Sequence, residues 1–163
     1  MRCALSVGIG IAALLICTPV LAQTSPFLTG ATALYTVDAS PSDPNFYDAP
    51  AFKRPLAGLI ARDKPRLLLD IHASHADRPY EVDLGTMNGA SLLGRAYLVP
   101  ALIEALRAEG LANISLDYFP AAKQQSDVKF AAARGVPAIQ LEINITRLRP
   151  SRGEFEAHRF AQL

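Results

Sequence analysis

The chain has 163 residues, of which 50% are hydrophobic and 19% are charged, and its formal net charge is +1. This composition excludes a disordered chain, and the length is sufficient for one domain with a hydrophobic core. The low charge, the lack of a Lys/Arg run and the absence of Trp argue against a nucleic-acid partner.

The first 22 residues have the pattern of a signal peptide. Arg2 supplies a positive charge, Ala4–Cys17 is almost wholly apolar, and Val20-Leu21-Ala22 places small residues at the −3 and −1 positions. The pattern predicts cleavage before Gln23 and export through a Sec-type pathway, to the periplasm or outside the cell. An uncleaved segment that anchors the chain in a membrane is the alternative, and no other contact with a membrane is expected.

Both cysteines, Cys3 and Cys17, lie within this segment, so the exported chain has no disulfide and no thiolate ligand. Residues 23–50 are rich in turn-forming residue types and are expected to be extended or irregular, apart from a short β-prone run at Ala33–Val37. Residues 51–163 are expected to form one α/β domain.

Within this domain, segments with helical and strand patterns follow one another. The expected helices are Ala51–Ala61, Tyr97–Ala108, Asp127–Arg134 and Gly153–Gln162. The expected strands are Arg66–His72, Asn113–Phe119 and Val136–Ile145. The polar stretch Ala73–Gly94 is predicted to be a loop that contributes to a site. The alternation predicts an α/β fold with a mostly parallel sheet flanked by helices, and the small number of strands suggests that the sheet is incomplete.

Two of the apolar runs carry residues with useful chemistry. Leu67–Ile71 leads into His72, and Glu142 lies within the run that starts at Val136. In an open α/β sheet the site lies at the carboxyl ends of the strands, so a metal ligand and a general base are expected to meet there. A buried carboxylate has a raised pKa unless it is paired, which suits a base, although an ion pair of Glu142 with an arginine is an equal alternative.

Several neighbouring residues are further candidates. Asp70 precedes His72 by two positions, so both side chains share one face of a strand and Asp70 can orient the imidazole. His75 and Asp77 follow shortly after and are possible further metal ligands, although turn residues of these types are more common. Arg147 and Arg149 are candidates to bind an acidic substrate, and a solvated side chain is the more frequent outcome for each.

The motifs resemble those of the N-formylglutamate amidohydrolase family, whose fold and mechanism are similar to those of zinc carboxypeptidases. The resemblance rests on Arg66–Ser74, on the Gly85–Gly89 turn and on Ala138–Asn144, with Asp43-Pro44-Asn45 upstream. It implies that His72 is the last of three zinc ligands and that Glu142 activates the zinc-bound water. It also implies a small N-acyl amino acid or peptide-like amide as the substrate. Arginine is expected to hold the substrate carboxylate, and Asn88 of the turn is grouped with Arg147 and Arg149 as substrate-binding.

The chain departs from the family at the upstream metal ligands. The family's first two ligands, a histidine and a glutamate, lie upstream of the third, and between Gln23 and His72 this chain contains neither residue type. The chain is therefore a truncated or degenerate member, or His75 and an aspartate have become ligands. Besides the hydrolase, the alternatives are an inactive relative that binds a small ligand or a protein, and a truncated fragment.

Overall fold

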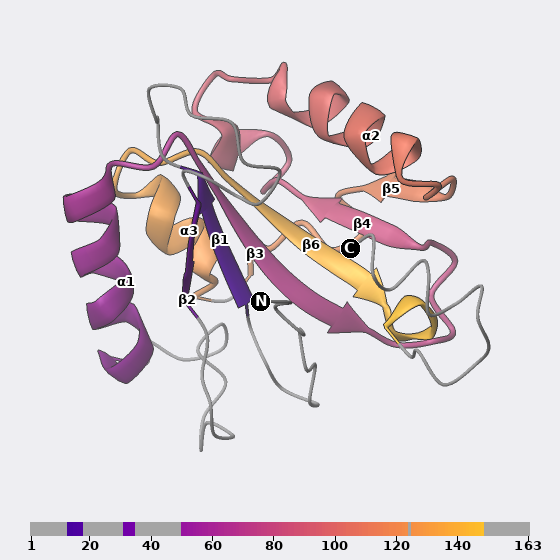
Figure 1. Cartoon of the computed structure of the whole chain (residues 1–163), viewed down its shortest axis with the longest axis horizontal. Coiled ribbons are helices and arrows are strands. Elements are labelled where there is room, and N and C mark those ends of the chain that lie inside the picture. Colours follow the sequence, from indigo (N-terminus) through magenta and orange to yellow (C-terminus); the bar gives the residue numbers. More distant parts are fainter. Residues whose placement is uncertain (1–12, 18–30, 35–49, 124, 149–163) are drawn as a thin grey trace, which may run out of the picture.

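A computed structural model of the whole chain describes residues 13–17, 31–34, 50–123 and 125–148, with side chains described at Leu34 and from Phe52 onward. One sheet runs through the described part, in the strand order β2-β1-β3-β6-β4-β5 (Figure 1). The strands are β1 (Ala13–Cys17), β2 (Ala31–Leu34), β3 (Leu67–Ser74), β4 (Val82–Gly85), β5 (Ile114–Leu116) and β6 (Ala138–Asn144). The helices are α1 (Pro50–Asp63), α2 (Leu98–Ala108) and α3 (Asp127–Ala132), with the short 3-10 turns η1 (Ala90–Leu92) and η2 (Ile145–Arg147).

The chain has an α/β fold, and the strands β3, β6, β4 and β5 form a mixed sheet. The β3–β6 and β4–β5 pairs are parallel, whereas β6 and β4 are antiparallel. On the other side of β3, β1 is antiparallel to both β3 and β2. The expectation of a mostly parallel sheet is therefore wrong.

The loop between β3 and β4 explains the difference. Only residues 75–81 separate the two strands, and a return to the opposite end of a sheet needs a dozen residues or more. The chain therefore re-enters the sheet at the end where β3 stops, and β4 runs in the opposite direction to β3. The predicted loop Ala73–Gly94 thus contains a strand, which occupies the place between β6 and β5.

One face of the sheet is covered by α1 and α3, which lie at its β1–β2 side in Figure 1. The apolar residues of α1 recur every four positions, at Phe52, Leu56 and Ile60, and they pack with α3 and with the first residues of β3 and β6. Helix α3 begins at Ser126, whose hydroxyl accepts a hydrogen bond from the Lys129 backbone N–H at 3.1 Å. This face of the sheet therefore has an apolar half, which lies at the start of β3.

On the other face, the described side chains of β3, β6 and β4 are aliphatic and are covered by α2, which lies beside β4 and β5 in Figure 1. Alternate residues of β3, β6 and β4 point to this side. The cluster consists of Leu69, Val82, Leu84, Leu92, Val99, Leu111, Ile139, Leu141 and Ile143. The two faces of the sheet thus differ in chemistry, and this difference places the polar residues described below on one side only.

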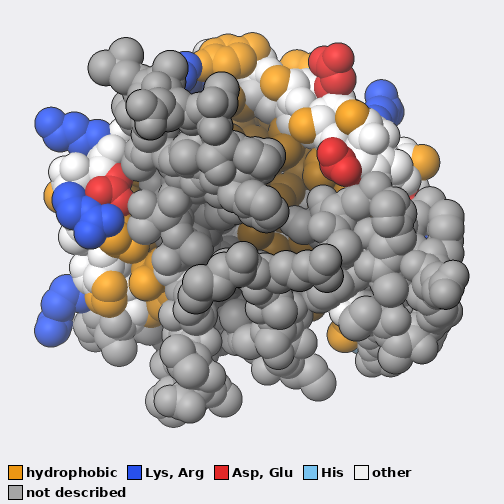
Figure 2. Space-filling model, in the orientation of Figure 1, with side chains coloured by type: hydrophobic (Ala, Val, Ile, Leu, Met, Phe, Trp, Pro, Cys, Tyr) orange, Lys and Arg blue, Asp and Glu red, His pale blue; other side chains and the backbone are white. Residues whose placement is uncertain are grey.

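The surface of the described residues is mixed in character. On the face shown in Figure 2, Lys and Arg side chains are separated by hydrophobic and acidic ones. None of the described helices has the length and apolar composition that crossing a membrane requires.

Most elements expected from the sequence occur, with ends that differ by a few residues. The helix expected at Gly153–Gln162 lies outside the described residues, as do most residues of the expected signal segment. The exception in that segment is Ala13–Cys17, whose backbone forms β1.

Candidate active site

The structure brings His72 and Glu142 together. They are directly opposite each other on the parallel neighbours β3 and β6, so their side chains lie on the same face of the sheet. This is the face that α1 and α3 cover at the other end of the strands. Both side chains are partly exposed, as a site that must admit a ligand requires.

Asp70 orients the imidazole of His72. The Nε2 atom of His72 lies 2.9 Å from Oδ1 of Asp70, and Asp70 is almost completely buried, with 1% of its surface exposed. The carboxylate accepts the Nε2 proton, so in the neutral ring Nδ1 carries the lone pair. This is the arrangement in which a histidine acts as a base or a metal ligand through one nitrogen while a carboxylate holds the other.

Glu142 lies in a setting that favours its protonated form. Burial raises the pKa of its carboxyl above the usual range, and the nearby negative charges of Asp70 and Asp83 raise it further. His72 and a hydrogen bond from the Gln140 amide act in the opposite direction, and the net direction is upward. A carboxylate of raised pKa is a stronger base, which suits the removal of a proton from water.

Asp83 of β4 continues the same row across the sheet, because it is paired with Glu142. Its buried carboxylate accepts hydrogen bonds from the Ser115 hydroxyl at 2.6 Å and from the backbone N–H groups of Tyr118 and Phe119 at 3.1 and 2.8 Å. Asp83 thereby fixes the loop that follows β5. The guanidinium of Arg78 stacks on this loop, 4.6 Å from the ring centre of Phe119.

The same loop packs directly on the sheet next to the site. A Cβ atom at Gly85 would lie only 2.4 Å from the carbonyl oxygen of Phe119 and 3.2 Å from Cβ of Gln140. Only glycine permits this approach. The loop therefore forms a wall beside the residues that precede Glu142.

Three buried polar atoms near the pair have no hydrogen-bond partner of normal geometry: Oδ2 of Asp70, Oγ of Ser74 and the hydroxyl of Tyr80. Burial raises the pKa of Tyr80, and the charges of Glu142 and Asp83 contribute in the same direction, whereas the adjacent Ser74 hydroxyl opposes them. Buried polar atoms are almost always satisfied in folded proteins. Their concentration around one pair of residues marks this end of the sheet as a place for a polar ligand or water.

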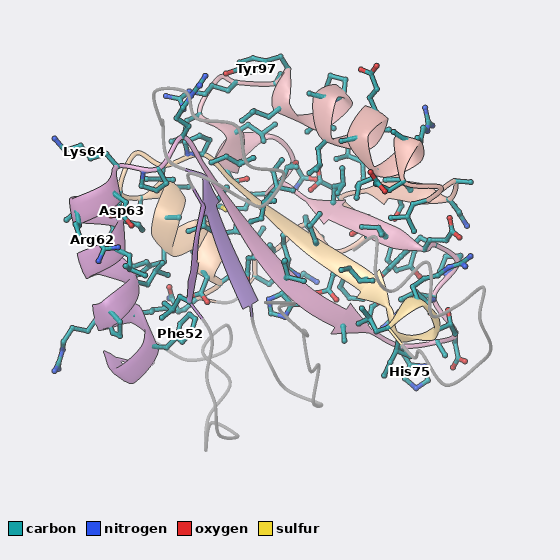
Figure 3. The ribbon with its side chains drawn as sticks, in the orientation of Figure 1. Phe52, Arg62, Asp63, Lys64, His75 and Tyr97 are labelled. Atoms are coloured by element: carbon teal, nitrogen blue, oxygen red, sulfur yellow. The ribbon has the colours of Figure 1, made fainter. Side chains whose placement is uncertain are left out.

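The other expected site residues that the structure describes lie apart from this pair. His75 lies past the end of β3 and points away from the sheet (Figure 3), where its Nδ1 atom is 3.1 Å from the Asp77 carboxylate. Arg147 forms an ion pair with Glu81. Asn88 follows the end of β4, on the side of Gln140 that is remote from Glu142. Arg149 and the Asp43-Pro44-Asn45 segment lie outside the described residues.

The described residues do not assemble a metal site of the expected kind. In the part of the chain that the structure describes, no three His, Cys, Asp or Glu side chains are grouped so that they could hold a metal ion. His72 and Glu142 lie opposite each other on β3 and β6. A third ligand beside them is not among the described residues.

Sequence reasoning missed Tyr80 and Asp83, which belong to the region taken as a loop. The signal was present in the sequence, because Tyr80-Glu81-Val82-Asp83-Leu84 alternates between apolar and polar residues, as a half-buried strand does. Comparison of the chain with family models, curated proteins and solved structures gave no match.

Proposed function

We propose that this protein is an exported amide hydrolase of the N-formylglutamate amidohydrolase type, acting on a small N-acyl amino acid or peptide-like substrate. The observation that supports the proposal best is the pairing of His72 with Glu142 on one polar face. The buried Oδ2 of Asp70 and the adjacent hydroxyls of Ser74 and Tyr80, which have no hydrogen bond of normal geometry, lie near this pair. The resemblance of the two strand motifs supports the same conclusion independently.

Glu142 has the properties of the general base. As a carboxylate it takes a proton from a water molecule while the water oxygen attacks the amide carbonyl carbon. When the C–N bond breaks, the same proton passes to the leaving nitrogen, and the carboxylate is regenerated. The raised pKa of Glu142 serves both steps, because the group must accept the proton and then release it.

Zinc would be held by His72 in a protein of this class, and when bound it would polarise the carbonyl and activate the water. The described residues fit this role only in part, since His72 and Glu142 stand together without a third ligand among them. The proton transfers assigned to Glu142 do not depend on the metal. Elemental analysis tests whether the protein holds zinc.

A protein that binds the same kind of ligand without hydrolysing it is the second candidate. The incomplete ligand set in the described residues favours it. Such a protein would still use the polar face beside Tyr80 and Asp70. It differs from the hydrolase only because the bound ligand is recovered unchanged.

Turnover by the purified, processed protein tests the proposal. We expect N-formyl-L-glutamate or an N-acetylated amino acid to release a primary amine, measured with an amine-reactive dye. Glu142→Gln should lower kcat/KM by about 10²-fold or more, as loss of a general base does. The matched control is Glu104→Gln, the same substitution at an exposed position of α2, which should leave kcat/KM unchanged.

Elemental analysis of the same samples separates the candidates. About one equivalent of zinc that is lost in His72→Ala supports a metal-dependent hydrolase. Saturable binding without amine release supports the binding protein. The proposal would be contradicted if N-formyl-L-glutamate and the N-acetylated amino acids were neither bound nor hydrolysed. Full activity of Glu142→Gln would also contradict it.

A further inference from the structure

One short segment, Ala13–Cys17, is both part of the expected signal peptide and a strand of the sheet. Ala13–Cys17 belongs to the apolar part of the expected signal peptide, and its backbone also forms β1, between β2 and β3. Cleavage before Gln23 would remove β1. The backbone of β3 that faces Ala13–Cys17 would lose its partner from Leu67 to Ile71, and β2 would lose the strand to which it is paired.

We propose that, once residues 1–22 are removed, β2 moves into the place of β1 and pairs with β3 as a parallel neighbour. This inference rests on the export that is part of the proposed function. It does not depend on amide hydrolysis.

The strand directions permit the exchange without any reversal. Strand β2 is antiparallel to β1, and β1 is antiparallel to β3, so β2 already runs in the same direction as β3. Parallel neighbours need a long connection, usually a helix that crosses one face of the sheet. Residues 35–66 connect β2 to β3, and they include α1, which covers such a face. The result is a β-α-β unit.

The registers also agree. Leu34 and Asp70 are both paired with Leu14, and Ala31 and Leu67 are both paired with Cys17. A sideways movement of β2 therefore brings Leu34 beside Asp70 and Ala31 beside Leu67, without sliding along the strand. Leu34 already packs against the cluster formed by α1 and α3, and in the new position it remains on that face.

An empty edge at β3 would be unfavourable. Unpaired backbone groups next to apolar side chains invite pairing with another chain, and natural proteins cover or block such edges. A second copy of the protein is the competing occupant. The tethered β2 has the advantage, because its connection holds it near β3 at all times.

An engineered disulfide distinguishes these occupants. The processed protein has no cysteine of its own, since Cys3 and Cys17 are removed. Neighbouring strands are about 4.8 Å apart, so the Cα atoms of residues 31 and 67 are about 5 Å apart after the exchange and about 10 Å apart with β1 between them. A disulfide requires a Cα separation of about 4.4–6.8 Å. Ala31→Cys/Leu67→Cys should therefore form a bond within one chain only after processing.

The full chain with both substitutions is expressed for export, and the protein is purified and its intact mass is measured. The mismatched control is Ala31→Cys/Ala73→Cys, whose second position lies six residues further along β3, about 20 Å away. We expect the first pair to oxidise almost completely within one chain and the control pair to remain reduced.

Other results would overturn the inference. Two free thiols in a monomer would show that β2 does not reach β3. A disulfide between two chains, or a dimer, would show that a second copy takes the edge. An N-terminus at Met1 in the purified protein would remove the premise, and would do so whether or not the protein hydrolyses amides.

Discussion

Replacing Asp83 by Asn tests the hydrogen-bond arrangement that holds the loop after β5 against the sheet. The carboxylate is completely buried and accepts three hydrogen bonds, of which two come from backbone N–H groups. Asparagine of the same shape has one acceptor oxygen and one amide group. In its better orientation it keeps the bonds from Ser115 and Tyr118, and its amide then faces the N–H of Phe119.

The expected loss of stability follows from the hydrogen bonds that asparagine keeps and the one that it loses. One buried backbone donor without a partner costs about 1–3 kcal/mol, and the two remaining bonds lose the extra strength that a charged acceptor gives. Removal of a negative charge near Glu142 returns a small part of this loss. We therefore expect the free energy of unfolding to fall by about 2–4 kcal/mol. For a chain of this size, Tm should fall by about 5–15 °C.

Urea and thermal unfolding followed by far-UV circular dichroism measure this change, since the chain has no Trp to serve as a fluorescent probe. Asp77→Asn is the matched control, because its side chain is 86% exposed, and it should lie within about 0.5 kcal/mol of the wild type. Ser115→Ala removes one donor and should cost about 1 kcal/mol. An Asp83→Asn protein as stable as the wild type would refute the role assigned to this carboxylate.

Three further substitutions test the site. Gly85→Ala should lower the free energy of unfolding by about 1–3 kcal/mol in urea, because its Cβ would meet the Phe119 carbonyl oxygen. Tyr80→Phe should leave Tm within a few degrees of the wild type or raise it, since the hydroxyl makes no normal hydrogen bond, and a large fall would contradict this. Burial holds the pKa of Glu142 above its unfolded value, so its ionisation destabilises the fold as pH rises through the folded-state pKa. Glu142→Gln should therefore stabilise the protein at pH 7, and this gain should vanish below the unfolded pKa; a variant whose free energy of unfolding equals that of the wild type at pH 7 would contradict it.

The sequence predicts those elements whose signals are local. The runs that lead to His72 and Glu142 are strands, and the helical spacing of Phe52, Leu56 and Ile60 corresponds to α1. The end signals at Ser126 and Gly110 lie beside the start of α3 and the end of α2. In each case the deciding information lies within a few residues of the element itself.

The features that the sequence did not predict depend on contacts between distant segments. The direction of β4 follows from the short loop after β3 and from the arrival of β6 between the two strands. The partner of Arg147 is Glu81, which is 66 positions earlier in the chain. Ala13–Cys17 is apolar whether it serves as a signal segment or as a strand, so its hydrophobicity alone does not choose between these uses.

The contrast between the two faces of β6 has a consequence for insertions and deletions. Side chains alternate along this strand, with Gln140 and Glu142 on one side and Ile139, Leu141 and Ile143 on the other. A single residue inserted before Gln140 would move every later side chain of β6 to the opposite face of the sheet. The carboxylate of Glu142 would then lie in the hydrophobic cluster under α2. Two inserted residues would restore the orientation but displace the carboxylate by about 7 Å along the strand. Length variation in this protein should therefore be found in the exposed turn ahead of α2, and not in β6.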